Sequence, residues 1–204
     1  MKKLVVIING KGGVGKDTLC DFAKKMYKVK NISAITPIKE IAYANGWNGE
    51  KNAKSRKFLA DLKQLFVEYN DLPVQYLLSQ YHEFLKSKEN ILFVHIREGE
   101  EIDKFKKEIE IPCITLLITR DMPGNELWGN SADDNVEQYQ YDYVYNNEGN
   151  LKETETRFCQ YIKDIFQREA YEVQRKTYKL RFRRTMNIEK RRTRKFEWRS
   201  KSRA

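Results

Sequence analysis

The chain has 204 residues, 40% of them hydrophobic and 33% charged, with a formal net charge of +10. This length suits one domain with a stable core and room for an extension. The 3 cysteines lie far apart without a Cys-x-x-Cys pair, which argues against a zinc site and a disulfide framework, and no apolar stretch approaches the roughly 20 residues of a membrane span. We therefore expect a cytoplasmic protein.

The positive charge is concentrated near the C-terminus. Residues 171–204 hold 14 Lys or Arg and 3 Glu, so residues 1–170 keep 25 basic and 26 acidic groups. We therefore expect a nearly neutral domain at residues 1–170 and a basic C-terminal extension at residues 171–204. Aromatic residues between the basic ones would suit weak contact with nucleic acid, and the charge would also suit an anionic membrane surface. An extension without a specific partner is the plainer interpretation.

Strand and helix patterns alternate along residues 1–170. Short apolar runs predict about five strands, at residues 3–9, 31–35, 90–96, 111–119 and 141–145. Apolar residues at helical spacing predict helices at residues 16–29, 38–44, 56–69, 70–86, 100–108 and 151–166. Long helical crossovers between strands produce a parallel sheet with helices on both faces, so the expected fold class is α/β.

Two segments of the expected domain suit the binding of a second ligand. The helices between about residues 37 and 87 are inserted between two strands, and we expect them to form an arm over an acceptor molecule. Residues 120–135 are rich in Pro, Gly, Asp and Asn, which is typical of a loop. We expect this loop to act as a lid.

A phosphate-binding motif lies between the first expected strand and the first expected helix. Gly10 and the pair Gly15 and Lys16 have the Walker A spacing. Glycines let backbone N–H groups approach an anion, the helix N-terminus contributes its positive end, and Lys16 adds a charge for the β- and γ-phosphates. We expect the ATP phosphates to contact Gly10, Lys11, Gly12, Gly13, Val14, Gly15, Lys16, Asp17 and Thr18.

The position after Lys16 departs from the Walker A pattern. The pattern places Ser or Thr there to hold Mg²⁺, whereas this chain has Asp17, and Thr18 follows one residue later. We expect Thr18 and Asp17 to hold Mg²⁺ beside ATP. The carboxylate of Asp17 would also be placed to orient the substrate.

Several stretches resemble nucleoside monophosphate kinases, especially the bacteriophage-type deoxynucleoside monophosphate kinases. The sequence Gly-Lys-Asp-Thr at residues 15–18 is one form of their loop, and Asp21 and Phe22 match an Asp-Phe pair that follows it. Residues 93–102 resemble their Asp-Val-Arg-Phe-x-x-Glu motif, with Arg97 in the Arg position. Residues 141–151 resemble their closing motif, Asp-Tyr-x-x-x-Asn-x-Gly-x-Leu.

This resemblance spans about residues 3–166. It implies a three-layer P-loop NTPase fold and transfer of the ATP γ-phosphate to a nucleoside or deoxynucleoside monophosphate, with Mg²⁺. The expected catalytic residues are Lys16, Arg97 and Arg120, the two arginines because each follows a strand at the ligand-binding edge of the sheet. The expected substrate-binding residues are Asp17, Lys39, Arg56 and Arg97.

One position departs from the family in a way that bears on activity. The family has Asp two residues before Arg97, where it helps to hold Mg²⁺, and this chain has His95. A neutral imidazole is a poor Mg²⁺ ligand. Either Glu98 or Asp17 would then supply the carboxylate, or metal binding and activity would be altered.

Two other classes of function remain open from the sequence. Lys11 and the following Gly-Gly-Val-Gly-Lys also resemble the deviant Walker A loop of partitioning ATPases, which dimerise on ATP and bind DNA. Against this class, the chain lacks a paired-Asp motif after the second expected strand and has Asp17 in place of Thr. The other alternative is a catalytically silent nucleotide-binding protein with a nucleic-acid-binding basic tail.

Overall fold

The computed structural model describes residues 2–121 and 136–201, and of residues 176, 177 and 180–201 it describes the backbone alone. Most of the lid expected at residues 120–135 therefore lies outside the described residues. The chain divides into two compact units, Met1–Lys163 and Asp164–Ala204.

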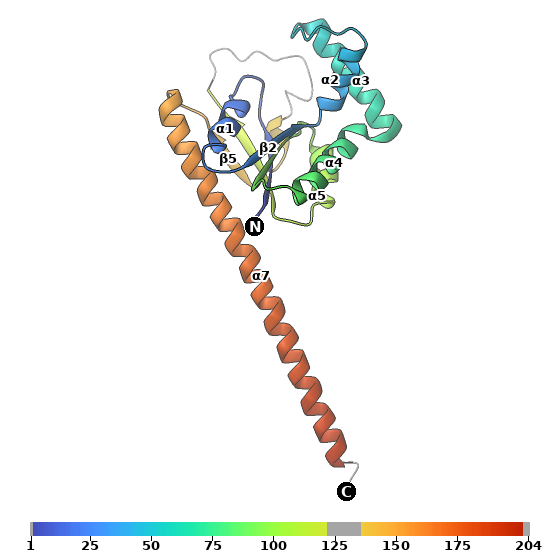
Figure 1. Ribbon diagram of the computed structural model, residues 1–204, viewed down its shortest axis with the longest axis vertical. Coiled ribbons are helices and arrows are strands. Elements are labelled where there is room, and N and C mark those ends of the chain that lie inside the picture. The colour runs from blue at the N-terminus through green and yellow to red at the C-terminus, as the bar shows by residue number, and fades with distance from the viewer. Residues whose placement is uncertain (1, 122–135, 202–204) are drawn as a thin grey trace. The chain divides into compact units, whose positions relative to one another are not determined.

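A five-stranded parallel sheet forms the centre of the first unit (Figure 1). Its strands, in chain order, are β1 (Leu4–Asn9), β2 (Val29–Ser33), β3 (Ile91–His95), β4 (Cys113–Thr119) and β5 (Tyr143–Asn146). Their order across the sheet is β2-β3-β1-β4-β5, and every neighbouring pair is parallel. The expectation of an α/β fold with about five parallel strands is confirmed.

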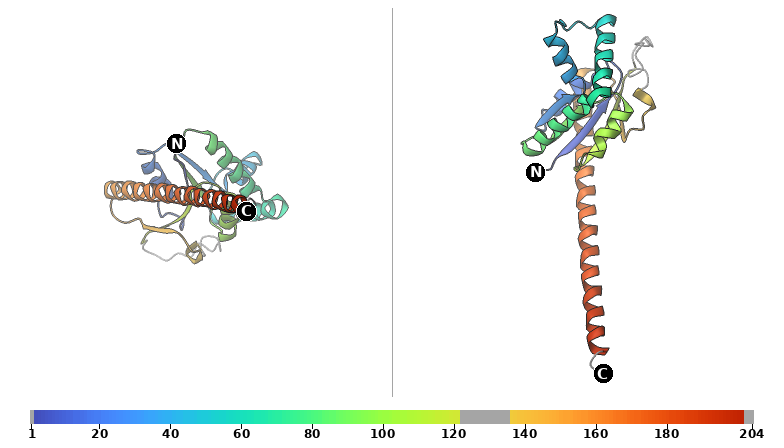
Figure 2. Two further views of the ribbon diagram at one scale, coloured as in Figure 1. Left: turned by 90° about the horizontal axis from the view of Figure 1, so that it is seen from below. Right: turned by 90° about the vertical axis from the view of Figure 1, so that its right-hand side faces the viewer.

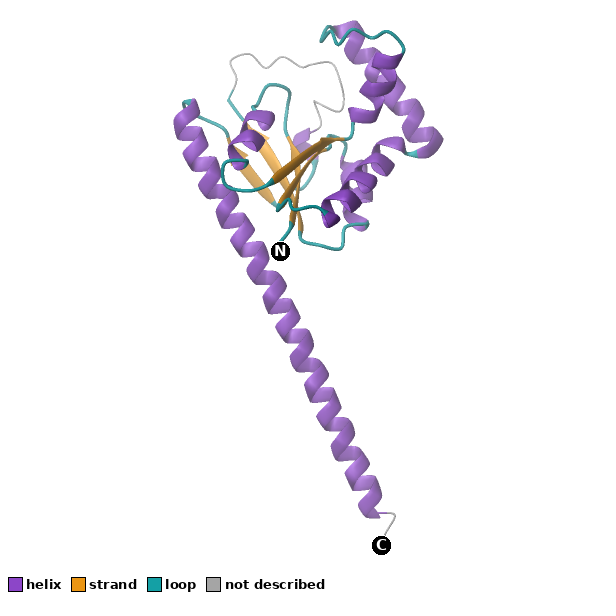
Figure 3. Ribbon diagram, in the orientation of Figure 1, coloured by secondary structure: helices purple, strands orange, loops and turns teal. Residues whose placement is uncertain are grey.

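Helices lie on both sides of this sheet, as Figure 3 shows. The helices in the described part of the chain are α1 (Lys16–Ala23), α2 (Thr36–Ala44), α3 (Ala53–Asn70), α4 (Leu72–Lys86), α5 (Gly99–Lys107) and α7 (Leu151–Lys201), with a short 3₁₀ helix η1 (Val136–Gln138). On one face, buried residues of β1 and β3 pack in one core cluster with Leu77 and Phe84 of α4 and Phe105 of α5. Alternate β1 residues point to the opposite face, because side chains of a strand alternate. Every residue of β1 is buried, which fits its place at the centre of the sheet.

The arm expected between residues 37 and 87 is formed by α2, α3 and α4. Figure 2 shows α2 and α3 side by side, projecting beyond the sheet. Asn52 caps α3 by accepting a hydrogen bond from the Ser55 N–H at 2.8 Å. The chain then reverses at Asp71, which has the left-handed conformation, and Pro73 lies in the first turn of α4.

The largest differences from the predicted boundaries are at the ends of α1 and α7. The first helix was expected to reach residue 29, but α1 ends at Ala23, and N–H groups of residues 24–27 bond to carbonyls of the last turn. Pairing of β2 with β3 already begins at Val29 opposite Ile91, so sheet formation decides this boundary. The last helix continues to Lys201 rather than stopping near residue 166. Among the described residues, no helix combines the length and the apolar character needed to cross a membrane.

Candidate nucleotide-binding site

The glycine-rich loop curls between β1 and α1 as the Walker A spacing predicts. Gly10 and Gly15 have φ angles of 147° and 92°, in the range that residues with a side chain rarely adopt. A Cβ atom on Gly10 would lie 2.4 Å from the Ile118 carbonyl oxygen of β4. Gly10 is therefore required both for the turn and for the close approach of the loop to the neighbouring strand.

The side chain of Lys16 lies within the curl of this loop. Its ammonium donates hydrogen bonds to the carbonyl oxygens of Gly10 and, at 2.8 Å, of Lys11. The first turn of α1 begins at the same place, with the Leu19 N–H bonded to the Gly15 carbonyl at 3.0 Å. A positive side chain and the N-terminus of a helix thus face one small region, which is the arrangement that binds phosphate groups.

Asn9 holds the start of this loop through a buried network. It is 1% exposed, and its Oδ1 accepts from the Gly10 N–H at 2.8 Å. Its Nδ2 donates to the Arg97 carbonyl at 3.0 Å and to the Tyr141 hydroxyl at 2.8 Å. Tyr141 in turn donates to the Val136 carbonyl at 2.8 Å. One asparagine therefore ties the loop to the end of β3 and to the segment that follows residues 122–135.

Asn147 holds the other side of the loop from the end of β5. Its side-chain Nδ2 donates to the Val14 carbonyl at 2.7 Å, and its backbone N–H donates to the Thr119 carbonyl at 2.8 Å. A Cβ atom on Gly15 would lie 2.6 Å from the same Nδ2. The side chain at position 147 therefore packs directly against the loop.

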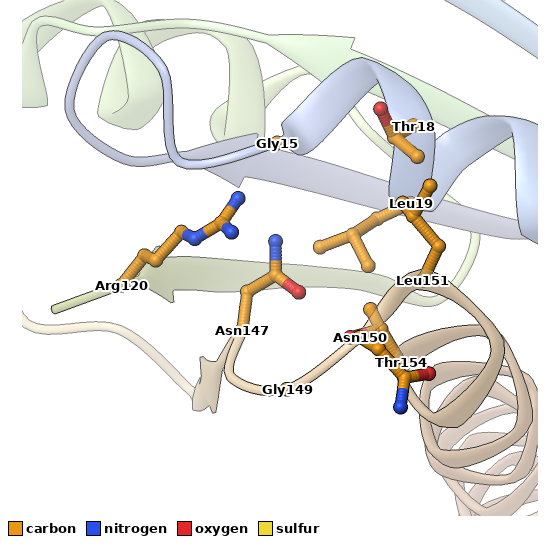
Figure 4. Close-up of a pocket in the computed structure, with 9 residues that line it drawn as sticks. All are labelled: Gly15, Thr18, Leu19, Arg120, Asn147, Gly149, Asn150, Leu151 and Thr154. Atoms are coloured by element: carbon orange, nitrogen blue, oxygen red, sulfur yellow. The ribbon is translucent and has the colours of Figure 1, made fainter. Parts of the chain in front are cut away.

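A pocket of about 260 Å³ lies beside the loop (Figure 4). Its walls come from the loop, α1, the end of β4, the turn before α7 and the first turn of α7. The lining residues are Gly15, Thr18, Leu19, Arg120, Asn147, Gly149, Asn150, Leu151 and Thr154. The guanidinium of Arg120 extends toward Asn147 in this view. The structure thus brings Arg120 and Thr18 into one site with the loop.

Asp17 and Thr18 lie on different sides of the start of α1. Thr18 lines the pocket, whereas the Asp17 carboxylate is 91% exposed and lies 3.9 Å from Nε2 of His95. Successive helical residues differ by about 100° around the axis, which accounts for the divergence. The two residues expected to hold Mg²⁺ therefore face different neighbours.

His95 is a neutral residue at the end of β3. Burial lowers its pKa to about 4, and Lys16 and Arg97 act in the same direction against the opposite effect of Asp17. Its Nε2 lies 2.7 Å from Asn31 Oδ1, a distance at which the Nε2–H tautomer donates to the amide oxygen. The imidazole is therefore uncharged at pH 7 and is held by a neighbouring strand.

Glu98 is engaged by Lys63, which sequence reasoning missed. The Lys63 ammonium lies 2.5 Å from the Glu98 carboxylate and 2.9 Å from that of Glu101. Burial raises the pKa of Glu101 to about 7 against the effect of Lys63, and the charge of Glu98 acts in the same direction as burial. For Glu98 the charge and hydrogen bond of Lys63 outweigh burial, so its pKa stays below the ordinary value. Of the two carboxylates considered for Mg²⁺, Glu98 is thus part of an ion pair between α3 and the start of α5.

The remaining expected substrate residues lie on exposed surfaces. Arg97 follows β3 at the carboxyl edge of the sheet, and its side chain is exposed. Lys39 on α2 and Arg56 on α3 are exposed on the arm. Lys11 is paired with Glu137 of η1 at 3.1 Å, which links the loop to the segment after residue 135.

Similarity of this chain to known proteins was found among solved structures. No family model and no curated protein matches the chain. Among solved structures, a Deinococcus radiodurans tunicamycin resistance protein is similar at 11% identity over 79% of this chain and 96% of that chain, with a TM-score of 0.51. A shikimate kinase from Bacteroides thetaiotaomicron aligns at 15% identity over 78% of this chain and 98% of that chain, with a TM-score of 0.42. A plasmid partition protein from Borrelia burgdorferi aligns at 15% identity over 80% of this chain and 99% of that chain, with a TM-score of 0.33.

The fold is that of P-loop NTPases. Sequence reasoning found the glycine-rich loop itself but missed the two asparagines that hold it. Asn9 could have been noticed as the one polar residue of an otherwise apolar strand. Asn147 stands in the closing motif at residues 141–151, but the motif alone does not say that its side chain reaches a loop 133 residues away.

Proposed function

We propose that the protein is an ATP-dependent phosphotransferase that moves the γ-phosphate of ATP to a nucleoside or deoxynucleoside monophosphate. The observation that supports this most directly is the curled loop with the Lys16 ammonium inside it, next to the pocket that contains Arg120. Phosphoryl transfer depends mainly on positioning and on neutralisation of charge, which such a loop supplies.

In this proposal the ATP phosphates lie on residues 12–18 and the nucleoside lies in the pocket beside Arg120. A guanidinium plane can stack on a base, and the polar groups of Asn147 and Asn150 can meet its edges. Gly15 of the loop lines the pocket, so a nucleotide in the pocket could reach the loop with its phosphate end. Thr18 lines the pocket. In this placement its hydroxyl would lie near the phosphate closest to the ribose.

The acceptor would lie over the carboxyl ends of β1 and β3, beneath the arm. Arg97 stands at that edge, and Lys39 and Arg56 come from α2 and α3. An oxygen of the acceptor phosphate would attack the γ-phosphorus while the bond to the β-phosphate oxygen breaks, so ADP leaves. Arginine side chains suit the acceptor end of this transfer because one guanidinium can donate two hydrogen bonds to the oxygens of a phosphate.

Magnesium would be held by Asp17 and by phosphate oxygens. Mg²⁺ usually keeps several waters and takes one or two carboxylates plus substrate phosphates, so the exposed Asp17 beside the loop fits such a site. Bound Mg²⁺ would neutralise charge that develops on the phosphates. His95 is neutral and bonded to Asn31, and Glu98 is paired with Lys63, so neither is assigned to the metal.

One observation favours a second candidate, a nucleotide-binding protein without transferase activity. His95 stands where the resembled kinases have a metal-binding Asp, and the structure offers Asp17 as the exposed carboxylate nearby. Such a protein would bind ATP in the same loop and pocket but would not turn it over.

A coupled assay of ADP release, run with every common nucleoside and deoxynucleoside monophosphate, separates these two candidates. We expect at least one acceptor to stimulate ADP release, and Lys16→Ala to lower that rate roughly 100-fold to 1,000-fold, as for loss of a principal charge-stabilising group. Lys28→Ala, at an exposed lysine outside the site, is the matched control and should retain the rate. ATP binding without stimulation by any acceptor would contradict the transferase proposal and support the silent one.

A further inference from the structure

The basic part of α7 combines high positive charge with a continuous helical backbone. The helix runs from Leu151 to Lys201, and within residues 171–201 the sequence has 13 Lys or Arg and 3 Glu. Residues 1–170 are close to neutral, so this one helix accounts for the net charge of the whole chain. The segment belongs to the second compact unit, Asp164–Ala204.

Many of these charges repeat at the spacing of a helical turn. Like charges stand four residues apart in the pairs Lys179 and Arg183, Lys190 and Arg194, and Arg191 and Lys195. Like charges at this spacing lie on neighbouring turns and destabilise an isolated helix. A partner that carries a dense row of negative charges would remove this repulsion and stabilise the helix.

No side of the described part of this segment is an apolar face. Tyr171 is 64% exposed, Val173 is 43% exposed and Tyr178 is 72% exposed. Tyr171 and Val173 are two residues apart, so their positions lie on nearly opposite sides of the helix. By the same periodicity, positions 180 and 198 fall opposite positions 182 and 196, although all four residues are apolar. A helix that lies in a membrane surface needs one apolar face and one polar face, and this segment does not have that division.

We propose that residues 171–201 bind double-stranded DNA as a helix lying in the major groove. Basic residues at positions all around a helix match a groove that has phosphates on both of its walls, and the major groove of B-form DNA admits a helix. The deep, narrow major groove of double-stranded RNA does not. This binding is independent of the proposed transferase activity, because it uses no residue of the loop or the pocket.

The test is the binding of the full-length chain to a fluorescently labelled DNA duplex of about 24 base pairs, over a range of salt concentrations. The test variant changes five basic residues to Gln: Lys190, Arg191, Arg192, Arg194 and Lys195. The matched control changes five exposed lysines of the first unit to Gln, which removes the same net charge: Lys28, Lys51, Lys86, Lys88 and Lys107. Glutamine is used because it keeps helix propensity close to that of Lys and Arg.

We expect the unmodified chain to bind the duplex with an affinity that falls steeply as salt rises. The test variant should bind at least tenfold more weakly at 0.1 M salt. The slope of log affinity against log salt should be smaller in magnitude by about four, since each phosphate contact contributes about 0.9 to it. The control variant should stay within about twofold of the unmodified chain. The helical circular dichroism signal of the unmodified chain should increase when the duplex is added.

Three results would overturn the proposal. The first is no binding of the unmodified chain to the duplex at 50 mM salt, with a cooperative urea unfolding transition as evidence of a folded protein. The second is an equal loss in the control variant, which would show that overall charge rather than this helix is responsible. The third is tighter binding to vesicles containing phosphatidylserine, to single-stranded DNA or to double-stranded RNA than to the DNA duplex.

Discussion

The two ends of the proposed transfer reaction are built differently. On the ATP side, the loop is held by Asn9 and Asn147, which are buried, and both side chains bond to loop or strand groups at 3.0 Å or less. On the acceptor side, Arg97, Lys39 and Arg56 are exposed, and α3 also exposes Leu65 at 63% and Tyr69 at 84%. In the proposed reaction, a nucleotide site held by buried hydrogen bonds would thus face an acceptor surface of exposed side chains.

The physical reason for this difference is the cost of burying polar groups. A loop that binds phosphate must hold its N–H groups in place before the ligand arrives, so its other polar groups need permanent partners. An arm that must admit and release a ligand cannot be fixed by the same kind of buried network. The cluster of Lys63, Glu98 and Glu101 joins α3 of the arm to the start of α5.

The largest effect is expected when the buried network on the ATP side is broken. Asn9→Leu keeps the number of side-chain heavy atoms and the branch at Cγ. It leaves the Gly10 N–H, the Arg97 carbonyl and the Tyr141 hydroxyl without this partner. We expect the free energy of unfolding to fall by about 3 kcal/mol, measured by urea denaturation, because unsatisfied buried groups are costly.

Tyr141→Phe is the graded control for this change. It removes one hydroxyl that contacts both Asn9 and the Val136 carbonyl, and it should cost about 1 kcal/mol. A fully stable Asn9→Leu variant that also binds ATP normally would show that the loop does not depend on this network.

A smaller effect is expected at the acceptor side from Arg97→Ala. The side chain is exposed, so the fold should tolerate its loss, while the proposed contact with acceptor phosphate would disappear. We expect the KM for the acceptor to rise roughly tenfold to 100-fold, as for loss of a charge-assisted hydrogen bond, with the KM for ATP within about twofold. Steady-state kinetics with each substrate varied in turn would measure both. An equal rise in the two constants would contradict the division into two regions.

The smallest effect concerns how the free energy of unfolding depends on pH through the cluster of Lys63, Glu98 and Glu101. Burial raises the pKa of Glu101 to about 7 in the folded protein, above its ordinary value of 4.5. The folded state therefore binds this proton more tightly than the unfolded chain, and the associated stability is present below pH 4.5 and lost as pH rises through 7. Glu101→Gln should accordingly gain stability relative to the unmodified protein between pH 5 and pH 8, by roughly 2–3 kcal/mol in urea denaturation.

Glu100→Gln supplies the matched control, because Glu100 is the exposed neighbour of Glu101 on α5. Its difference from the unmodified protein should not change over this pH range. If the pH dependence of Glu101→Gln were the same as that of Glu100→Gln, the pKa of Glu101 would not be raised in the folded protein.

The sequence by itself determined the sheet and the loop. Continuous apolar runs marked buried parallel strands, and the spacing of Gly10, Gly15 and Lys16 predicted a turn that the structure confirms. These features depend on residues close together in the chain, so local periodicity and backbone geometry are enough to find them. The predicted end of α1 was wrong because it depends on a distant segment: pairing with β3 decides where β2 begins.

Only the tertiary structure decided which polar residues meet. Asn147 reaches Val14 across 133 positions of sequence, and Lys63 meets Glu98 and Glu101 from another helix. Neither contact leaves a periodic pattern, because a single polar side chain between two distant segments has no spacing to repeat. The order of strands and the packing of the arm bring these residues together. The resulting burial and charge contacts shift the pKa values of His95, Glu98 and Glu101.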